Sequence, residues 1–184
     1  MSENKNIKNF EFTKKNLEQV KKIFSKYPGD QKVSAVMPLL DLAMRQIGGW
    51  ITKSAISHIS ILLDIPFIRV YEVASFYSMF NLEPIGKNFV QVCTTTSCWL
   101  RGSDDILNVC KKHLNIENNQ TTKDGLFTWM EVECLGACVN APMIQINDNY
   151  YEDLDTKSLI NILDNIKEGK EVNIGPQNKK RKGA

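Results

Sequence analysis

The 184-residue sequence predicts an α+β protein, in which a helical N-terminal part precedes a part whose elements run in the order β-α-β-β-β-α. Three observations predict this class. Apolar residues recur at helical spacing early in the chain, short apolar runs bounded by turn residues follow, and helical spacing returns near the end. We expect an N-terminal helical bundle over 1–84, a mixed domain over 85–170 and a polar C-terminal tail over 171–184.

The N-terminal part carries four helical patterns. Thr13 is placed to cap the first pattern, and Pro28 ends it. The second pattern spans about 33–47, and Thr52 opens the third. Pro66 begins the fourth, because proline is accepted at the first position of a helix.

The fourth pattern is apolar on nearly every side. Its apolar residues are Ile68, Val70, Tyr71, Val73, Phe76, Tyr77, Met79 and Phe80. A helix of this kind either lies at the centre of a bundle or keeps apolar surface for a partner protein.

The C-terminal part begins with a strand, a helix and a second strand. The first strand, 89–92, runs directly into Cys93. A helix over about 102–113 follows, with a cap and acidic residues in its first turn. The second strand, 126–133, ends on Cys134. Strands joined through a helix in this way are parallel, so their carboxyl ends lie at the same edge of the sheet.

Four of the five cysteines lie where these two strands end. They form a C-x4-C pair, Cys93 and Cys98, and a C-x3-C pair, Cys134 and Cys138. Because the strand ends converge, we expect the four thiols to meet. By spacing alone, a 2Fe–2S cluster and a structural zinc are equally favoured, and disulfides are less so. A thioredoxin-type redox motif is excluded, because neither pair has two residues between its cysteines.

The rest of the C-terminal part completes the pattern. Strands at 143–146 and 150–151 form a hairpin. A final helix begins at Asp155 or Thr156 and ends at Gly169. Four strands and two helices in this order are the layout of a thioredoxin-like domain.

Composition excludes several classes of function. A hydrophobic content of 42% and a charged content of 24% are those of an ordinary soluble protein, and a net charge of +2 is too small to indicate nucleic-acid binding. No apolar run approaches the ~18 residues of a membrane span. Five cysteines without a secretory signal indicate a reducing compartment, where clustered cysteines bind metal.

Together, these motifs resemble the small, E-type 2Fe–2S subunit of NADH:quinone oxidoreductase (complex I). The resemblance rests on the cysteine spacing within 93–102 and 133–138, on Gly48-Gly49-Trp50 and on the segment 70–77. The late Gly175-Pro176-Gln177 is also similar. Either cysteine pair alone is a weak signal, whereas the combination is specific and covers nearly the whole chain.

The resemblance implies a thioredoxin-like ferredoxin domain that binds one 2Fe–2S cluster through Cys93, Cys98, Cys134 and Cys138. It further implies that the cluster exchanges single electrons with the FMN of a partner subunit, that FMN and NADH bind to that partner only, and that a second iron–sulfur subunit lies nearby. The chain alone would not be catalytic. It would be cytoplasmic and peripheral at the inner membrane, or on the matrix side in a mitochondrion, with only indirect membrane contact. The apolar segment Tyr71–Phe80 is then favoured as an interface.

One departure from the family pattern and several rival interpretations accompany the resemblance. Ser97 stands where many relatives have proline, which affects the stiffness of the loop. An equivalent subunit of an NAD-linked hydrogenase or formate dehydrogenase fits the same motifs. An iron–sulfur regulator would use 52–80 as a helix-turn-helix, but Arg69 is balanced by Glu72 and few other polar groups could contact DNA.

The remaining candidate residues are interpreted structurally. Cys110 shares a helix face with apolar residues and is expected to be a buried, inert thiol. His58 and His113 are expected to face solvent or to form hydrogen bonds. Trp99 either shields the cluster or packs at the base of the loop. The basic run Lys179–Lys182 is expected to be a solvated tail.

Overall fold

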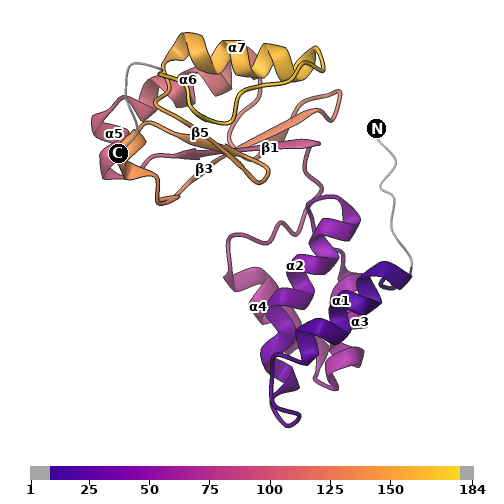
Figure 1. Cartoon of the computed structure of the whole chain (residues 1–184). Helices are drawn as coiled ribbons and strands as arrows, with labels where there is room; N and C mark the ends of the chain where they lie inside the picture. Colours follow the sequence, from indigo (N-terminus) through magenta and orange to yellow (C-terminus); the bar gives the residue numbers. More distant parts are fainter. Residues whose placement is uncertain (1–8, 179–184) are drawn as a thin grey trace. The chain divides into compact units, whose positions relative to one another are not determined.

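The computed structural model describes residues 9–178, which fold into two compact units, 9–84 and 85–178 (Figure 1). The first unit is helical, and the second combines a sheet with helices. Within the described range, every helix is too short or too polar to cross a membrane.

The described part of the first unit contains four α-helices. They are α1 (Lys14–Phe24), α2 (Val36–Ile47), α3 (Lys53–Leu63) and α4 (Phe67–Phe76), with a 3-10 turn at Lys32–Ala35 before α2. The hydroxyls of Thr13 and Thr52 accept backbone N–H groups at the starts of α1 and α3, as their residue types predict. The core of the unit includes Leu39, Leu40, Ala43, Ile56, Ile59 and Val70.

The fourth helix differs from the prediction at both ends. Pro66 precedes α4 as its N-cap instead of occupying its first position, and α4 ends at Phe76 rather than continuing to Phe80. The side chain of Phe80 is 5% exposed and packs in the core, whereas that of Phe76 is 80% exposed. Within 71–80, the exposed large apolar side chains are therefore those of Phe76, Tyr77 and Met79, at and just beyond the end of α4.

Hydrogen bonds beyond the helix explain this early end. The Asn81 carbonyl accepts the backbone N–H of Ile51 at 2.7 Å. The Asn81 side-chain amide donates to the Gly49 carbonyl at 2.9 Å. These bonds hold the chain after α4 against the loop that follows α2, so the helix cannot continue.

The described strands of the second unit form one six-stranded sheet in the order β2-β3-β1-β4-β5-β6. Their bounds are β1 (Asn88–Cys93), β2 (Gln120–Thr121), β3 (Phe127–Val132), β4 (Ile144–Ile146), β5 (Asn149–Glu152) and β6 (Gly175–Pro176). Helices α6 (Ser103–Leu114) and α7 (Thr156–Lys167) lie side by side over one face of this sheet (Figure 1). The core beneath them includes Val90, Val92, Ile106, Phe127, Ile144, Leu159 and Ile162.

The predicted parallel pair is confirmed. Strands β1 and β3 pair in parallel with Cys93 opposite Val132, and α6 belongs to the connection between them. Strand β4 then runs antiparallel to β1. The carboxyl ends of β1 and β3 therefore lie at the same edge of the sheet.

Three short elements were not predicted. Strands β2 and β6 have two residues each, and the helix α5 (Thr96–Leu100) has five. Segments this short carry no measurable periodicity. Strand β6 pairs with β5 within the segment expected to be a polar tail, so part of 171–184 belongs to the sheet. The basic run Lys179–Lys182 lies outside the described residues.

Helix α7 begins with a capping box that offers a test of local stability. The Asp155 carboxylate accepts the Ser158 backbone N–H at 2.7 Å, and the Ser158 hydroxyl accepts the Asp155 backbone N–H at 2.8 Å. The hydrogen bonds with Ser158 hold the pKa of the Asp155 carboxyl below its usual range, and the bond from the Ser158 backbone N–H has the largest effect.

We expect Asp155→Ala to lower the free energy of unfolding by about 1 kcal/mol at neutral pH. Because the carboxyl pKa is depressed on folding, this contribution is present above the pKa of the unfolded state and is lost as pH falls through the folded pKa. Urea unfolding of the wild type and the variant, compared at neutral and acidic pH, measures it. Equal stabilities at neutral pH would show that the cap contributes nothing.

Candidate metal centre

The four clustered cysteines (Cys93, Cys98, Cys134 and Cys138) lie at the shared strand edge of the second unit. Cys93 is the last residue of β1, and Cys98 lies in α5, directly after it. Cys134 follows the end of β3, and Cys138 begins a short 3-10 turn. The parallel pairing of β1 and β3 is what brings the two loops together.

The thiols meet as two pairs. The Sγ atoms of Cys134 and Cys138 are 3.4 Å apart, and Cys93 and Cys98 lie together in a small buried cluster. Leu135 and Ala137, which lie between Cys134 and Cys138 in the sequence, pack against this cluster, so the pairs are neighbours. The structure therefore brings together all four residues that the sequence singled out.

Two hydroxyl groups between the cysteines also contact the thiols. The Thr95 hydroxyl lies 3.5 Å from the Cys93 Sγ. It also acts to lower the pKa of Cys134, and the Ser97 hydroxyl acts in the same direction on the pKa of Cys138. Sequence reasoning missed both roles. The available signal was the presence of hydroxyl residues inside the C-x4-C loop, but the spacing does not show which of them faces the sulfurs.

Backbone N–H groups contact three of the sulfurs. Those of Leu135, Gly136 and Met143 donate to Cys93, Cys134 and Cys98, respectively. The N–H of Gly102, after the first pair, donates instead to the Trp99 carbonyl at 3.0 Å.

The environment of the first pair separates the acidities of its two thiols. Burial acts to raise the pKa of Cys93, but hydrogen bonds from Thr95 and Leu135 outweigh it, so this pKa lies below its ordinary value. Burial, followed by the hydrogen bond with Cys93, raises the pKa of Cys98 to about 12.

The second pair shows the same division. The backbone N–H of Gly136 is the main cause that lowers the pKa of Cys134, whereas the hydrogen bond with Cys134 raises the pKa of Cys138. One cysteine of each pair thus favours the thiolate, which is the form that binds metal.

Burial gives the site an inner and an outer side. Cys93 and Cys98 are 2% and 1% exposed, whereas Cys134 and Cys138 are exposed. Trp99 is 59% exposed beside Cys98, so it neither packs at the base of the loop nor is buried over the sulfurs. Leu100 and Val139, which are close in sequence to Cys98 and Cys138, are also exposed apolar residues.

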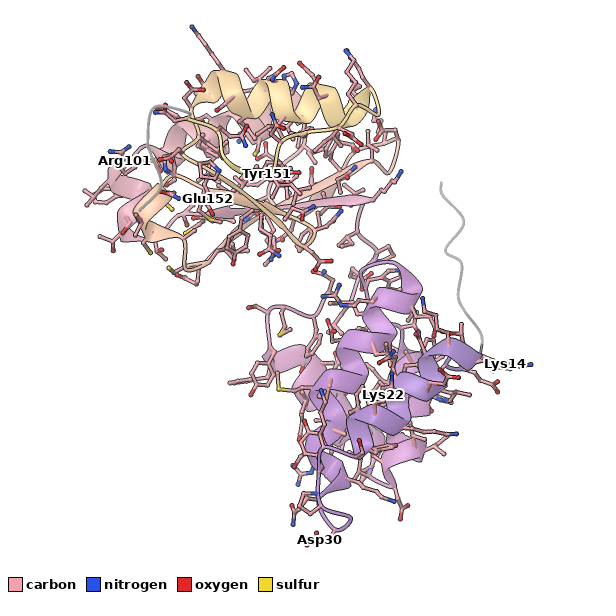
Figure 2. The ribbon with its side chains drawn as sticks, in the orientation of Figure 1. Lys14, Lys22, Asp30, Arg101, Tyr151 and Glu152 are labelled. Atoms are coloured by element: carbon pink, nitrogen blue, oxygen red, sulfur yellow. The ribbon has the colours of Figure 1, made fainter. Side chains whose placement is uncertain are left out.

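The second loop is fixed to the sheet by side chains of β5. The Tyr150 hydroxyl donates to the Leu135 carbonyl at 2.7 Å. The Asn140 amide donates at 2.6 Å to the carboxylate of Glu152, which is labelled in Figure 2. These two bonds hold the segment carrying Cys134 and Cys138 at both of its ends.

The set of donors fits a two-iron cluster. All five cysteines fall in the described part of the chain, and each is a free thiol rather than half of a disulfide. Among residues 9–178, no group of three or more histidine, cysteine or carboxylate side chains is spaced for a single metal ion. Four cysteines that lie as two neighbouring pairs would supply the all-thiolate donor set that a 2Fe–2S cluster requires.

The other candidate ligands lie elsewhere. Cys110 is completely buried in the core beneath α6, and burial raises its pKa to about 12. His58 contacts the rings of Phe10 and Phe12 edge-on in the helical unit. His113 lies 2.8 Å from a carboxylate oxygen of Asp164. These contacts agree with the expectations for Cys110 and His113, whereas His58 packs against aromatic rings instead of facing solvent.

Comparison with known proteins identifies related sequences. Residues 20–167 match the family described as thioredoxin-like [2Fe-2S] ferredoxin. The E subunit of NADH-quinone oxidoreductase from Rickettsia bellii is 56% identical over 164 residues, which cover 89% of this chain and 98% of that protein. The mitochondrial NADH dehydrogenase [ubiquinone] flavoprotein 2 of Dictyostelium discoideum is 57% identical, over 91% of this chain and 68% of that protein.

A solved structure shares the fold. A chain in the crystal structure of NAD+-reducing [NiFe]-hydrogenase in the air-oxidized state superposes with a TM-score of 0.62 and 21% identity. The match covers 71% of this chain and 23% of the hydrogenase chain. At this level of identity the likeness concerns the fold alone.

Proposed function

The chain belongs to the thioredoxin-like 2Fe–2S ferredoxin family, and from this premise we propose that it is the one-electron-carrying subunit of the NADH-oxidising module of an NADH:quinone oxidoreductase. The observation that carries the proposal is the meeting of two cysteine pairs where β1 and β3 end. Relatives at 55–57% identity bear the names of this complex, which favours it over an NAD-linked hydrogenase or a formate dehydrogenase.

In this proposal, the four clustered cysteines bind the cluster and the groups around them stabilise its charge. Cys93, Cys98, Cys134 and Cys138 would hold the cluster, which when bound accepts and releases one electron at a time. The N–H groups of Leu135, Gly136 and Met143 offset the negative charge of the thiolates. The buried first pair keeps water from the inner side, while the exposed second pair leaves a route for electrons to a partner.

The same chemistry requires a flavin on another chain. NADH releases two electrons as a hydride, whereas the proposed cluster site takes one, so a flavin must accept the pair and pass its electrons on singly. This sequence has no glycine-rich dinucleotide fingerprint. We therefore place FMN and NADH on a partner subunit. A neighbouring iron–sulfur subunit and a peripheral position at the cytoplasmic or matrix face belong to the same proposal.

The end of α4 is the surface that we assign to partner contact. Phe76 and Tyr77 are exposed there with their rings 5.0 Å apart, edge to face, and Met79 is exposed beyond them. Phe67 and Ile68, at the start of α4, are also exposed. Exposed aromatic and methionine side chains in one segment are typical of the centre of an interface.

Electron transfer from NADH tests the proposal. We expect the purified chain with its cluster to show no reduction of the cluster by NADH, and rapid reduction once the flavin-bearing subunit is added. The absorbance of the cluster reports reduction directly, and the flavin-bearing subunit stripped of FMN is the control. Reduction of the cluster by NADH in the absence of any flavin would disprove the proposal that NADH oxidation takes place on the partner subunit and electron transfer on this chain.

A further inference from the structure

Thr95 occupies a capping position without acting as a cap. It is the N-cap residue of α5, where threonine ordinarily accepts a backbone N–H of the first turn. Its side chain makes no such bond. The hydroxyl instead lies 3.5 Å from the Cys93 Sγ, and it acts to lower the pKa of Cys134 as well. A hydroxyl available for local capping is thus directed at the clustered cysteines.

We propose that Thr95 is a positioning residue whose hydroxyl donates a hydrogen bond to the Cys93 thiolate and thereby raises the reduction potential of the site. This inference rests on the proposed function, since it requires the four clustered cysteines to hold the cluster. Thr95 is well placed for this role because its hydroxyl lies 3.5 Å from the sulfur of the buried Cys93.

The direction of the effect follows from charge. Reduction adds one negative charge to a site already surrounded by thiolates, and a donor to sulfur stabilises the more negative state more strongly. Thr95 is only partly exposed and Cys93 is buried, so water cannot fully replace a lost hydroxyl. Removal of the hydroxyl should therefore make reduction less favourable.

The adjacent threonine, Thr94, provides the control for the loss of a hydroxyl from this loop. The Thr94 hydroxyl donates to the Glu131 carboxylate at 2.8 Å, away from the sulfurs. Thr94→Val therefore removes a hydroxyl from the same loop, with the same change of atoms, but leaves the contacts of Thr95 in place.

The experiment is a redox titration of the full chain with its cluster, followed by visible absorbance and paramagnetic resonance. We expect Thr95→Val to lower the equilibrium constant for reduction by about tenfold, which is about 59 mV for a one-electron couple. Thr95→Ser should restore the wild-type potential, because serine keeps the hydroxyl. Thr94→Val should leave the potential unchanged.

Several results would overturn the proposal. An unchanged potential in Thr95→Val, or a Thr95→Ser potential equal to that of the valine variant, would show that the hydroxyl does not act on the site. If Thr95→Val holds no cluster, Thr95→Ala gives a second hydroxyl-free protein, for which the same shift is expected. If neither hydroxyl-free variant holds the cluster, the serine variant decides. A Thr95→Ser protein that binds the cluster and has the wild-type potential supports a requirement for the hydroxyl, whereas a Thr95→Ser protein without the cluster contradicts that requirement.

Failure of the proposed function would be recognised separately. Iron and sulfide absent from the wild-type protein would show that the four clustered cysteines hold no cluster. A loaded wild type with an unshifted Thr95→Val would reject only the role of Thr95.

Discussion

Alanine in place of any one of the four clustered cysteines is expected to abolish the iron-dependent visible absorbance of the protein. The thiolate is the ligand, and alanine offers no donor atom in its place. A water molecule could reach the exposed Cys134 or Cys138 position, but not easily the buried Cys93 position, so the loss should be most complete there. Anaerobic purification followed by spectroscopy and iron analysis measures the effect.

Cys110 supplies the matched control for these variants. It is also buried, and it lies on α6 in the core rather than in the loops. Cys110→Ala should therefore keep the full absorbance and iron content while losing some packing in the core. Loss of the cluster from this variant, together with its retention after Cys134→Ala, would show that the ligands have been assigned wrongly.

A charge at the end of α4 should weaken partner binding by about ten- to a hundredfold. Burying a phenylalanine side chain contributes about 1.5–3 kcal/mol, and an aspartate at the same place would lose its hydration without gaining a partner. Phe76→Asp is the best variant, because Phe76 is 80% exposed and its replacement leaves the core intact. The cluster spectrum should not change, since Phe76 belongs to the helical unit. Affinity for the purified flavin-bearing subunit is the measurement.

Ile61 on α3 provides the comparison for Phe76. It is 78% exposed, belongs to the same unit and lies on a different helix. Ile61→Asp should bind the partner like the wild type. Equal weakening by both substitutions, or unchanged affinity after Phe76→Asp, would remove the end of α4 from the interface. Phe80 is not suitable for this test, because it is buried and its substitution would unfold the helical core.

Most of the second unit can be predicted from the sequence, because the strand, turn and capping patterns that define its elements are each contained in a short segment. Apolar strands that run into Cys93 and Cys134 locate the two cysteine pairs, and the parallel crossover rule brings the pairs to one edge of the sheet. The capping preference of Thr13 and Thr52 likewise locates two helix starts. In each case one short segment carries all the information that the prediction needs.

The features that were missed depend on contacts between distant segments. The end of α4 is set by the bonds of Asn81 to a loop some thirty residues earlier, and helical periodicity contains no trace of these bonds. Thr94 and Thr95 are identical in type and adjacent in sequence, yet one contacts Glu131 and the other the sulfurs. Only the geometry of the folded loop separates them.

Iron, acid-labile sulfide and zinc, measured in one sample of the anaerobically purified chain, test most directly the central claim that four cysteines hold a two-iron, one-electron site. Protein produced with iron in excess should contain about two irons and two sulfides per chain, and reduction should give a paramagnetic signal that integrates to about one electron. One zinc per chain without sulfide would contradict the claim, because it would identify the four cysteines as the ligands of a structural zinc.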